Sequence, residues 1–170
     1  YVIRQSPKRK AMRHIIAANI DLAVVVGAIK KPRTSTGFID RFLVSTEAYR
    51  ILTMIVINKV DDLREKDRTI LNDWINTYSK IGYTVLCTST VTGEGIEELK
   101  QIIANKRILF SGHSGVGKSS LLNELDPSLN LKIGDISKVH EKGMHTTTFS
   151  EMFRLKAYHA EIIDTPGIKE

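Results

Sequence analysis

Short apolar runs alternate along the chain with segments in which apolar residues recur every three or four positions. The runs are rich in β-branched side chains and have the length of buried strands, whereas the three- and four-residue spacing is typical of helices with one buried face. Strands are predicted over residues 20–29, 51–57, 83–87, 107–110, 149–158 and 161–163. Helices are predicted within residues 35–50 and 65–81, around 96–103 and near 118–125. The alternation predicts an α/β fold with a mostly parallel sheet.

Two segments depart from this alternation. Residues 1–14 carry five basic side chains around Pro7 and are predicted to form a basic linker that enters from a preceding module. Residues 126–147 are polar and irregular. Residues 15–170 are therefore expected to form one folded domain. In open α/β sheets ligands bind at the carboxyl ends of the strands, so binding residues are expected in the segments that follow predicted strands.

Composition narrows the class of protein. The 170 residues, 42% hydrophobic and 26% charged, exclude a disordered chain, a collagen and a coiled coil. No apolar run reaches the ~18 residues of a membrane helix, so no membrane partner is expected. The single cysteine, Cys87, excludes an internal disulfide and a Cys-rich zinc site and favours a reducing compartment. The formal charge of +6 favours polyanionic partners such as nucleic acid.

The segment G-H-S-G-V-G-K-S at residues 112–119 fits the phosphate-binding pattern G-x-x-x-x-G-K-[ST], between a predicted strand and a predicted helix. Backbone N–H groups and the helix N-terminus would bind phosphate, Lys118 would neutralise the β- and γ-phosphates in the reaction, and Ser119 would ligate Mg²⁺. The motif makes the expected fold a P-loop NTPase three-layer sandwich. The alternative is a glycine-rich turn without a ligand. The residues predicted to bind nucleotide here are Gly112, His113, Ser114, Gly115, Val116, Gly117, Lys118, Ser119 and Ser120.

The tetrapeptide Asn58-Lys59-Val60-Asp61 follows another predicted strand and is predicted to bind a guanine base. The Asp61 carboxylate would accept hydrogen bonds from guanine N1–H and the 2-amino group, a pair of donors that adenine lacks, and the wrong base would leave the carboxylate unpaired. The aliphatic stem of Lys59 would lie along the base, and Asn58 would tie the loop to its neighbours. The alternative is an ordinary charged loop at a strand end.

A second loop, S-T-V-T-G-E-G at residues 89–95, resembles the loop that closes over guanine in GTPases, where Ser-Ala-Lys precedes T-G-E-G. The expected contact is a backbone N–H to the guanine oxygen, which does not depend on the side chains that differ here. Ser89 and Thr90 are the residues predicted to line the base. The same segment also fits a helix N-terminus capped by Thr92, and both interpretations can hold together.

Two segments late in the chain fit the switches of a GTPase. D-T-P-G at residues 164–167 fits D-x-x-G, in which Asp164 would hold Mg²⁺ through water and the Gly167 N–H would contact the γ-phosphate. In H-T-T-T at residues 145–148, Thr147, or else Thr146, would give Mg²⁺ a hydroxyl and the γ-phosphate an N–H. The alternatives are a Pro-Gly turn and a threonine run that starts a strand.

The order of the motifs is unusual, because an ordinary GTPase begins with the phosphate loop, continues with the switches and ends with the base-reading loops. Here the base-reading loops come first, so the chain looks circularly permuted. Together with A-A-N-I-D at residues 17–21 and F-I-D-R-F-L at 38–43, this order resembles the RsgA/YjeQ family of permuted bacterial GTPases. The resemblance covers nearly the whole chain. It implies GTP hydrolysis in late assembly of the small (30S) ribosomal subunit, stimulated by that subunit.

The resemblance also implies neighbours and partners. The family has an N-terminal OB-fold, whose exit linker would be residues 1–14, and a C-terminal zinc-binding domain; zinc is expected only in that missing domain. The implied partners are GTP or GDP, Mg²⁺, the small subunit and its 16S rRNA, for a monomer in a bacterial cytoplasm. Basic residues that offer contacts to rRNA phosphates, with a solvated face as the alternative, are Lys8, Arg9, Lys10, Arg13, Lys30, Lys31 and Arg33.

One catalytic group is not evident. Ras-like enzymes place a water-orienting glutamine after the D-x-x-G glycine, whereas this chain has Ile168, so slow intrinsic hydrolysis is expected. His145, His113 or a ribosomal group are the candidates for that role, and a merely solvated histidine is the alternative. Two other functions stay open: a regulatory module that binds GTP or GDP with little turnover, and an ATP-dependent kinase or ATPase that reuses the phosphate loop.

Overall fold

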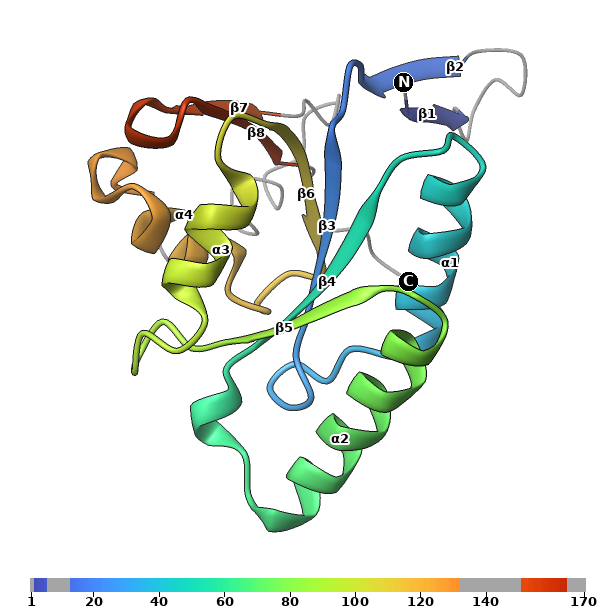
Figure 1. Ribbon diagram of the computed structural model, residues 1–170, viewed down its shortest axis with the longest axis vertical. Helices are drawn as coiled ribbons and strands as arrows, with labels where there is room; N and C mark the ends of the chain where they lie inside the picture. Colours follow the sequence, from blue (N-terminus) through green and yellow to red (C-terminus); the bar gives the residue numbers. More distant parts are fainter. Residues whose placement is uncertain (1, 6–12, 132–150, 165–170) are drawn as a thin grey trace, which may run out of the picture.

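A six-stranded sheet forms the centre of the molecule. The computed structural model describes residues 2–5, 13–131 and 151–164 (Figure 1). The sheet has the order β5-β4-β3-β6-β8-β7, and all neighbours are parallel except β7 and β8. Its strands are β3 (Leu22–Gly27), β4 (Thr53–Asn58), β5 (Thr84–Thr88), β6 (Arg107–Gly112), β7 (Glu151–Leu155) and β8 (Ala160–Asp164). The predicted α/β fold with a mostly parallel sheet is confirmed.

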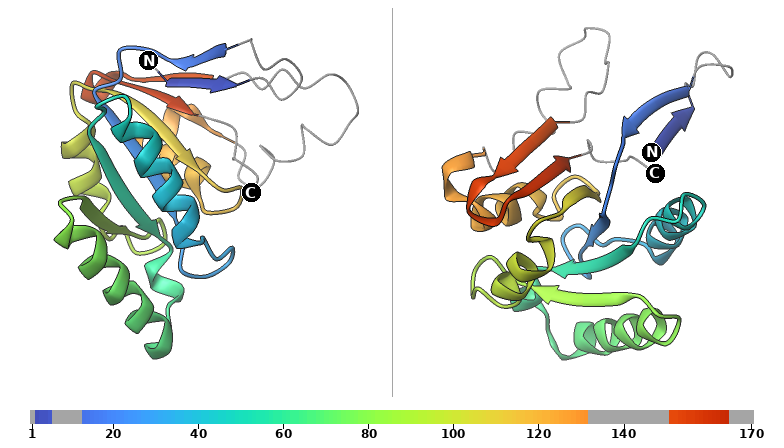
Figure 2. Two further views of the ribbon diagram at one scale, coloured as in Figure 1. Left: turned by 90° about the vertical axis from the view of Figure 1, so that its right-hand side faces the viewer. Right: turned by 45° about the horizontal axis from the view of Figure 1, so that its top comes forward.

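Four α-helices among the described residues cover the two faces of this sheet. They are α1 (Thr36–Glu47), α2 (Glu65–Lys80), α3 (Ile96–Ile103) and α4 (Lys118–Leu125). Figure 2 shows α1 and α2 on one side of the sheet and α3 and α4 on the other. The result is a sandwich of three layers, as the sequence predicts.

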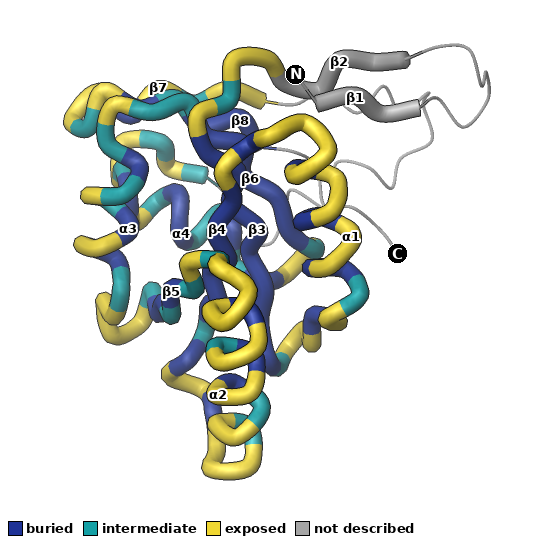
Figure 3. Tube along the Cα trace, turned by 45° about the vertical axis from the view of Figure 1, so that its right-hand side comes forward, coloured by how far each residue is buried: buried dark blue, intermediate teal, exposed yellow. Residues whose placement is uncertain are grey.

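The alternation of side chains along a strand separates two hydrophobic clusters. In β3, Val24 and Val26 pack into the cluster that contains Leu99 of α3 and Leu121 of α4. Ala23 and Val25, which point to the opposite face, belong to the cluster that contains Trp74 of α2. Figure 3 shows the central strands as buried and the outer surfaces of the helices as exposed. A strand that is apolar at every position is therefore explained by burial on both faces.

Some boundaries differ from the prediction. Residues 1–14, predicted as a linker, contain strand β1 (Val2–Gln5), which pairs antiparallel with β2 (Arg13–Ala17). The strand predicted over residues 149–158 is shorter, because a 3₁₀ turn, η3 (Lys156–Tyr158), reverses the chain between β7 and β8. The polar stretch begins with another 3₁₀ turn, η2 (Pro127–Leu129), and its residues beyond 131 lie outside the described part of the chain.

Parallel pairing determines where the predicted motifs meet. Strands β3, β4, β5, β6 and β8 all run in one direction, so their carboxyl ends lie along one edge of the sheet. The segments that follow β4, β5 and β6 are the two loops predicted to read the base and the loop predicted to bind phosphate, and Asp164 is the last residue of β8. Motifs that are far apart in the sequence are thus brought to one edge.

The core is expected to tolerate loss of volume poorly. Phe110 of β6 is fully buried, so Phe110→Ala should lower the free energy of unfolding by about 3–5 kcal/mol. Val44 of α1 is 69% exposed, so Val44→Ala should change it by no more than about 0.5 kcal/mol. Urea unfolding followed by circular dichroism measures both values, and equal stability of the two variants would contradict the assignment of Phe110 to the core.

Candidate nucleotide-binding site

The phosphate loop connects β6 to α4 and contains a buried lysine. The Nζ of Lys118 donates hydrogen bonds to the backbone carbonyls of Gly112 (2.8 Å) and His113 (3.3 Å). The lysine is only 8% exposed. Burial lowers its pKa, and the nearby Asp164 carboxylate opposes that change. The loop therefore holds one ammonium group inside its own curve, at the N-terminus of a helix.

Asp164 brings a carboxylate to the same place. It ends β8 and lies opposite Phe110 of the phosphate-loop strand in the register of the sheet. Burial raises its pKa to about 6; Lys118 acts against this increase, and Glu151 adds to it. Within the described ranges, its buried Oδ1 atom has no hydrogen-bond partner. A buried carboxylate oxygen with unused acceptor capacity next to a phosphate loop suits a bound cation.

The side-chain amide of Asn58 connects three segments. Its Nδ2 donates to the backbone carbonyl of Val116 in the phosphate loop (3.0 Å), and its Oδ1 accepts from the hydroxyl of Thr88 at the end of β5 (3.0 Å). Asn58 is 2% exposed, so both hydrogen bonds are shielded from water. This is the tie between neighbouring loops that the sequence predicts for Asn58.

Lys59 makes a second connection to the phosphate loop. Its backbone is left-handed, with φ of 65°, and its Nζ donates to the carbonyls of Gly115 (2.6 Å) and Lys31 (2.8 Å). Gly117 allows the close approach of these two loops, because a Cβ atom there would overlap the Nδ2 of Asn58. The base-reading loop and the phosphate loop are thus in direct contact.

Asp61 is bonded to the other base-reading loop. The hydroxyl of Ser89 donates to its Oδ1 (2.5 Å) and accepts from the backbone N–H groups of Val91 (3.1 Å) and Thr92 (3.2 Å). Ser89 itself is fully buried. The carboxylate predicted to read guanine is therefore held in place by the loop predicted to close over the base.

The predicted helix cap at Thr92 is wrong. Helix α3 begins at Ile96 with Gly95 at its N-cap, and Thr92 instead accepts a hydrogen bond from the backbone N–H of Glu94 (3.4 Å). Gly95 has φ of 70°, and a Cβ atom there would collide with the carbonyl of Cys87. The turn of the T-G-E-G segment is set by glycine, which places the start of the helix three residues later than a threonine cap would.

The remaining predicted residues fall into two groups. Thr90 lies in the turn after β5, Ser114 lies in the phosphate loop, and Ser119 and Ser120 form the first turn of α4. His113 packs its ring on Phe38 of α1, with 3.8 Å between ring centroids. The predicted His145, Thr146, Thr147 and Gly167 lie outside the described residues.

The segment after β3 was not predicted to take part in nucleotide binding. Residues 28–35 follow β3 at the same edge of the sheet, and the carbonyl of Lys31 accepts the hydrogen bond from Lys59. No nucleotide-binding pattern marks this segment. Its position could still have been anticipated, because β3 ends beside β4 and β6, and both of those strands are followed by predicted binding loops.

Comparison with known proteins agrees with the geometry. The family model described as RsgA GTPase matches residues 1–170. The chain belongs to the RsgA GTPase family. Among curated relatives, the small ribosomal subunit biogenesis GTPase RsgA of Bacteroides fragilis is 49% identical over 99% of this chain and 54% of its own length. That of Flavobacterium psychrophilum is 48% identical over 99% of this chain and 52% of its own. The chain thus spans about half the length of these RsgA relatives.

Solved structures of the same family share the fold. YjeQ from Thermotoga maritima gives a TM-score of 0.72 with 38% identity, covering 88% of this chain and 48% of that one. YloQ, a circularly permuted GTPase, gives a TM-score of 0.64 with 30% identity, covering 89% of this chain and 46% of that one. The permuted order of motifs expected from the sequence is therefore the order of the RsgA family fold.

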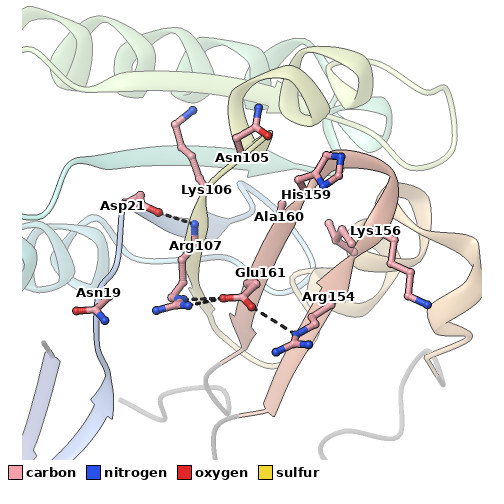
Figure 4. Close-up of a pocket in the computed structure, with 11 residues that line it drawn as sticks. Asn19, Asp21, Asn105, Lys106, Arg107, Arg154, Lys156, His159, Ala160 and Glu161 are labelled. Atoms are coloured by element: carbon pink, nitrogen blue, oxygen red, sulfur yellow. Dashed lines mark hydrogen bonds and ion pairs between the residues drawn. The ribbon is translucent and has the colours of Figure 1, made fainter.

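An open hollow of about 690 Å³ lies away from this site, at the amino ends of β3, β6 and β8 (Figure 4). Three of its charged side chains pair with one another, because Glu161 bridges Arg107 (2.6 Å) and Arg154 (3.4 Å). The backbone N–H of Arg107 donates to Asp21 (2.7 Å). These charged groups therefore have partners within the protein, and we assign the hollow no ligand.

Two features are absent from the described residues. No helix among them is both long and apolar enough to cross a membrane. The same part of the chain contains no group of three or more His, Cys, Asp or Glu side chains arranged to hold a metal ion.

The close approach of the two loops at Gly117 can be tested with a matched pair of variants. Gly117 has φ of 98° and Gly82 has φ of 94°, but only the Cβ of Gly117→Ala would strike Asn58; the Cβ of Gly82→Ala meets open space. Gly82→Ala should therefore cost about 1–2 kcal/mol of stability, the cost of a left-handed alanine. Gly117→Ala should cost more, because it also breaks the Asn58 hydrogen bond.

Thermal or urea unfolding compares the two variants, and nucleotide titration reports the site. Affinity should fall in Gly117→Ala and stay unchanged in Gly82→Ala. Equal loss of stability, with nucleotide affinity preserved in both, would contradict the proposed packing of Asn58 on Gly117.

Proposed function

We propose that this chain binds GTP and hydrolyses it to GDP and phosphate, and that the whole protein acts in late assembly of the small ribosomal subunit. One observation carries the proposal: the Asp61 loop and the Lys118 loop are joined by the hydrogen bonds of Asn58 and Lys59. A base-reading carboxylate and a phosphate-binding lysine thus belong to one rigid unit. The names of the curated relatives support the ribosomal role.

Guanine selection follows from the chemistry of Asp61. The Ser89 hydroxyl donates to its Oδ1 atom and thereby restricts the rotation of the carboxylate. A carboxylate fixed in this way accepts from N1–H and the 2-amino group of guanine together, whereas adenine leaves it unpaired at the cost of its desolvation. The base loop therefore favours GTP and GDP over ATP, which argues against a kinase or ATPase.

The residues present fit Mg²⁺. The buried oxygen of Asp164 that lacks a partner among the described residues suits a divalent cation or its bound water, and Ser119 stands at the first turn of α4 to give a hydroxyl. Thr147 is proposed as the third contributor. When bound, Mg²⁺ would neutralise charge on the β- and γ-phosphates. Zinc is proposed only for the domain expected beyond this chain.

The chain's own groups would work mainly by position and charge. The Lys118 ammonium, held by carbonyls at the helix N-terminus, would shift to the β- and γ-phosphate oxygens and stabilise the charge that develops on them. Water would attack the γ-phosphorus while the bond from that phosphorus to the β,γ-bridging oxygen breaks, so that GDP leaves and the proton of the water passes to the released phosphate. Because Ile168 stands where Ras-like enzymes have glutamine, His145 or a ribosomal group is proposed to orient that water.

The setting of the whole protein is proposed in the same way. It would act in the cytoplasm as a monomer that binds the small subunit and its 16S rRNA. The basic residues predicted to contact rRNA phosphates remain the proposed contacts. Lys30 and Lys31 also pair with Asp62, and the Lys30 side chain, 26% exposed, is less available to RNA than that of Lys31, which is 73% exposed.

The preferred base should change from guanine to xanthine when one of the two carboxylate oxygens of Asp61 is replaced by a donor. Asp61→Asn replaces a carboxylate oxygen by an amide donor, which matches the extra oxygen of xanthine, so the variant should prefer XDP over GDP. Asp62→Asn, at the neighbouring position, should keep the preference for GDP. Competition of GDP, XDP and ADP for the purified protein measures the order, and a variant Asp61→Asn that still prefers GDP would refute guanine selection by Asp61.

Ribosomal stimulation is a separate expectation. Purified small subunits should raise GTP turnover of the whole protein tenfold or more, which corresponds to about 1.4 kcal/mol of the barrier or more. Large subunits should have no effect, and Lys118→Ala should remain inactive with either. A turnover rate that is the same with and without small subunits would favour the regulatory module that binds nucleotide with little turnover.

A further inference from the structure

The loop between β3 and α1 carries none of the nucleotide-binding motifs, yet it lies at the edge of the nucleotide site and its two ends are hydrogen-bonded to each other. The β3–α1 loop, residues 28–35, begins and ends at a pair of hydrogen bonds. The backbone N–H of Thr34 donates to the carbonyl of Ala28 (2.8 Å), and the Thr34 hydroxyl accepts from the Ala28 N–H (3.0 Å). Thr34 is fully buried. The loop is therefore a fixed turn.

Two lysines of this loop hold the base-reading segment. The Nζ of Lys30 donates to the backbone carbonyl of Asp62 (3.2 Å) and lies 3.5 Å from its Oδ1, while the Nζ of Lys31 lies 3.6 Å from its Oδ2. The two ammonium groups keep the pKa of Asp62 below its usual value. The side chain of Lys30 is 26% exposed and that of Lys31 is 73% exposed, so water and salt weaken the Lys30 contact less.

The same loop also contacts the phosphate loop. Lys59 shares its Nζ between the carbonyls of Lys31 and Gly115. Pro32 lies beside Gly115: a Cβ atom added to Gly115 would lie 3.4 Å from the Cδ atom of the proline ring. The β3–α1 loop thus supports both the base-reading loop and the phosphate loop from one side.

Asp61 is therefore held from two directions. Ser89 bonds its carboxylate, and Lys30 bonds the carbonyl of Asp62, the next residue in the 3₁₀ turn η1 (Val60–Asp62). A carboxylate that accepts from two donors on one edge of a flat base needs both its position and its plane fixed. If the carboxylate is rotated away from the plane of the base, it can still accept from one donor but no longer from both.

We propose that Lys30 is a positioning residue for base selection. In this role it fixes the backbone beside Asp61 through the carbonyl of Asp62, so that the carboxylate reaches the 2-amino group of guanine as well as N1–H. This inference rests on the proposed binding of GTP and GDP. It predicts that the loss of Lys30 harms recognition of the 2-amino group more than nucleotide binding in general.

Inosine diphosphate tests this, because inosine keeps N1–H and lacks the 2-amino group. Titration of the protein with GDP and with IDP gives the ratio of the two dissociation constants. In Lys30→Met, GDP binding should weaken on the order of fivefold, while IDP binding should change less, so that the preference for GDP falls. Lys30→Arg keeps a cation that can bond the same carbonyl and should restore the preference.

Two control variants separate the contacts. Lys31→Met removes only the exposed ion pair, keeps the Lys31 carbonyl, and should change both constants less than about twofold. Asp62→Ala removes the carboxylate but keeps the carbonyl that Lys30 bonds, so its preference for GDP should fall less than that of Lys30→Met.

The outcomes are distinguishable. If the unchanged protein binds GDP but Lys30→Met weakens GDP and IDP equally, or weakens neither, the positioning role of Lys30 is overturned while the proposed function stands. If the unchanged protein binds neither nucleotide, the proposed function fails and this inference fails with it. A reduced preference for GDP in Lys30→Met that Lys30→Arg restores supports the inference.

Discussion

The amide of Asn58 is the interaction on which the rest of the site depends, because it uses both its donor and its acceptor inside the edge of the sheet. Its Nδ2 bonds the phosphate loop and its Oδ1 bonds Thr88, so the ends of β4 and β5 and the turn after β6 share one buried side chain. An aspartate there would set a carboxylate against the Val116 carbonyl, and a leucine would leave both partners unpaired. Asparagine supplies both the donor and the acceptor that this position requires. Its Nδ2 fits only because Gly117 has no Cβ atom.

This dependence on neighbouring strand ends explains why the order of motifs along the chain can change. The site needs β4, β3, β6 and β8 side by side and pointing the same way, which the register provides. The site does not require the phosphate loop to precede the other loops in the sequence. The predicted base-reading loops can therefore come before the phosphate loop, because parallel pairing determines which loops meet at the edge, whatever their order in the chain.

Patterns of local origin were predictable from the sequence, and contacts between distant segments were not. Apolar runs such as Leu22–Gly27 and the spacing that buries Trp74 identified the strands and helices, and the phosphate loop was evident from its glycines and Lys118. The Thr92 cap failed because the left-handed Gly95, not the threonine, determines where the helix starts. The pairing of Lys30 with Asp62 spans 32 positions and has no sequence pattern, since a charge run is usually solvated and only the fold brings these two loops together.

Two buried ionisable groups, Lys118 and Asp164, lie together at the end of the phosphate-loop strand and of β8. Burial favours the neutral forms of both Lys118 and Asp164, and each partly restores the charge of the other. A carbonyl pair satisfies the lysine, whereas one oxygen of Asp164 keeps an unused acceptor among the described residues. A nucleotide with a bound divalent cation would offer each of these groups an opposite charge: its phosphate oxygens would face the ammonium of Lys118, and the cation would face the carboxylate of Asp164. The pair of buried groups is thus chemically suited to the Mg²⁺-bound nucleotide proposed for this site.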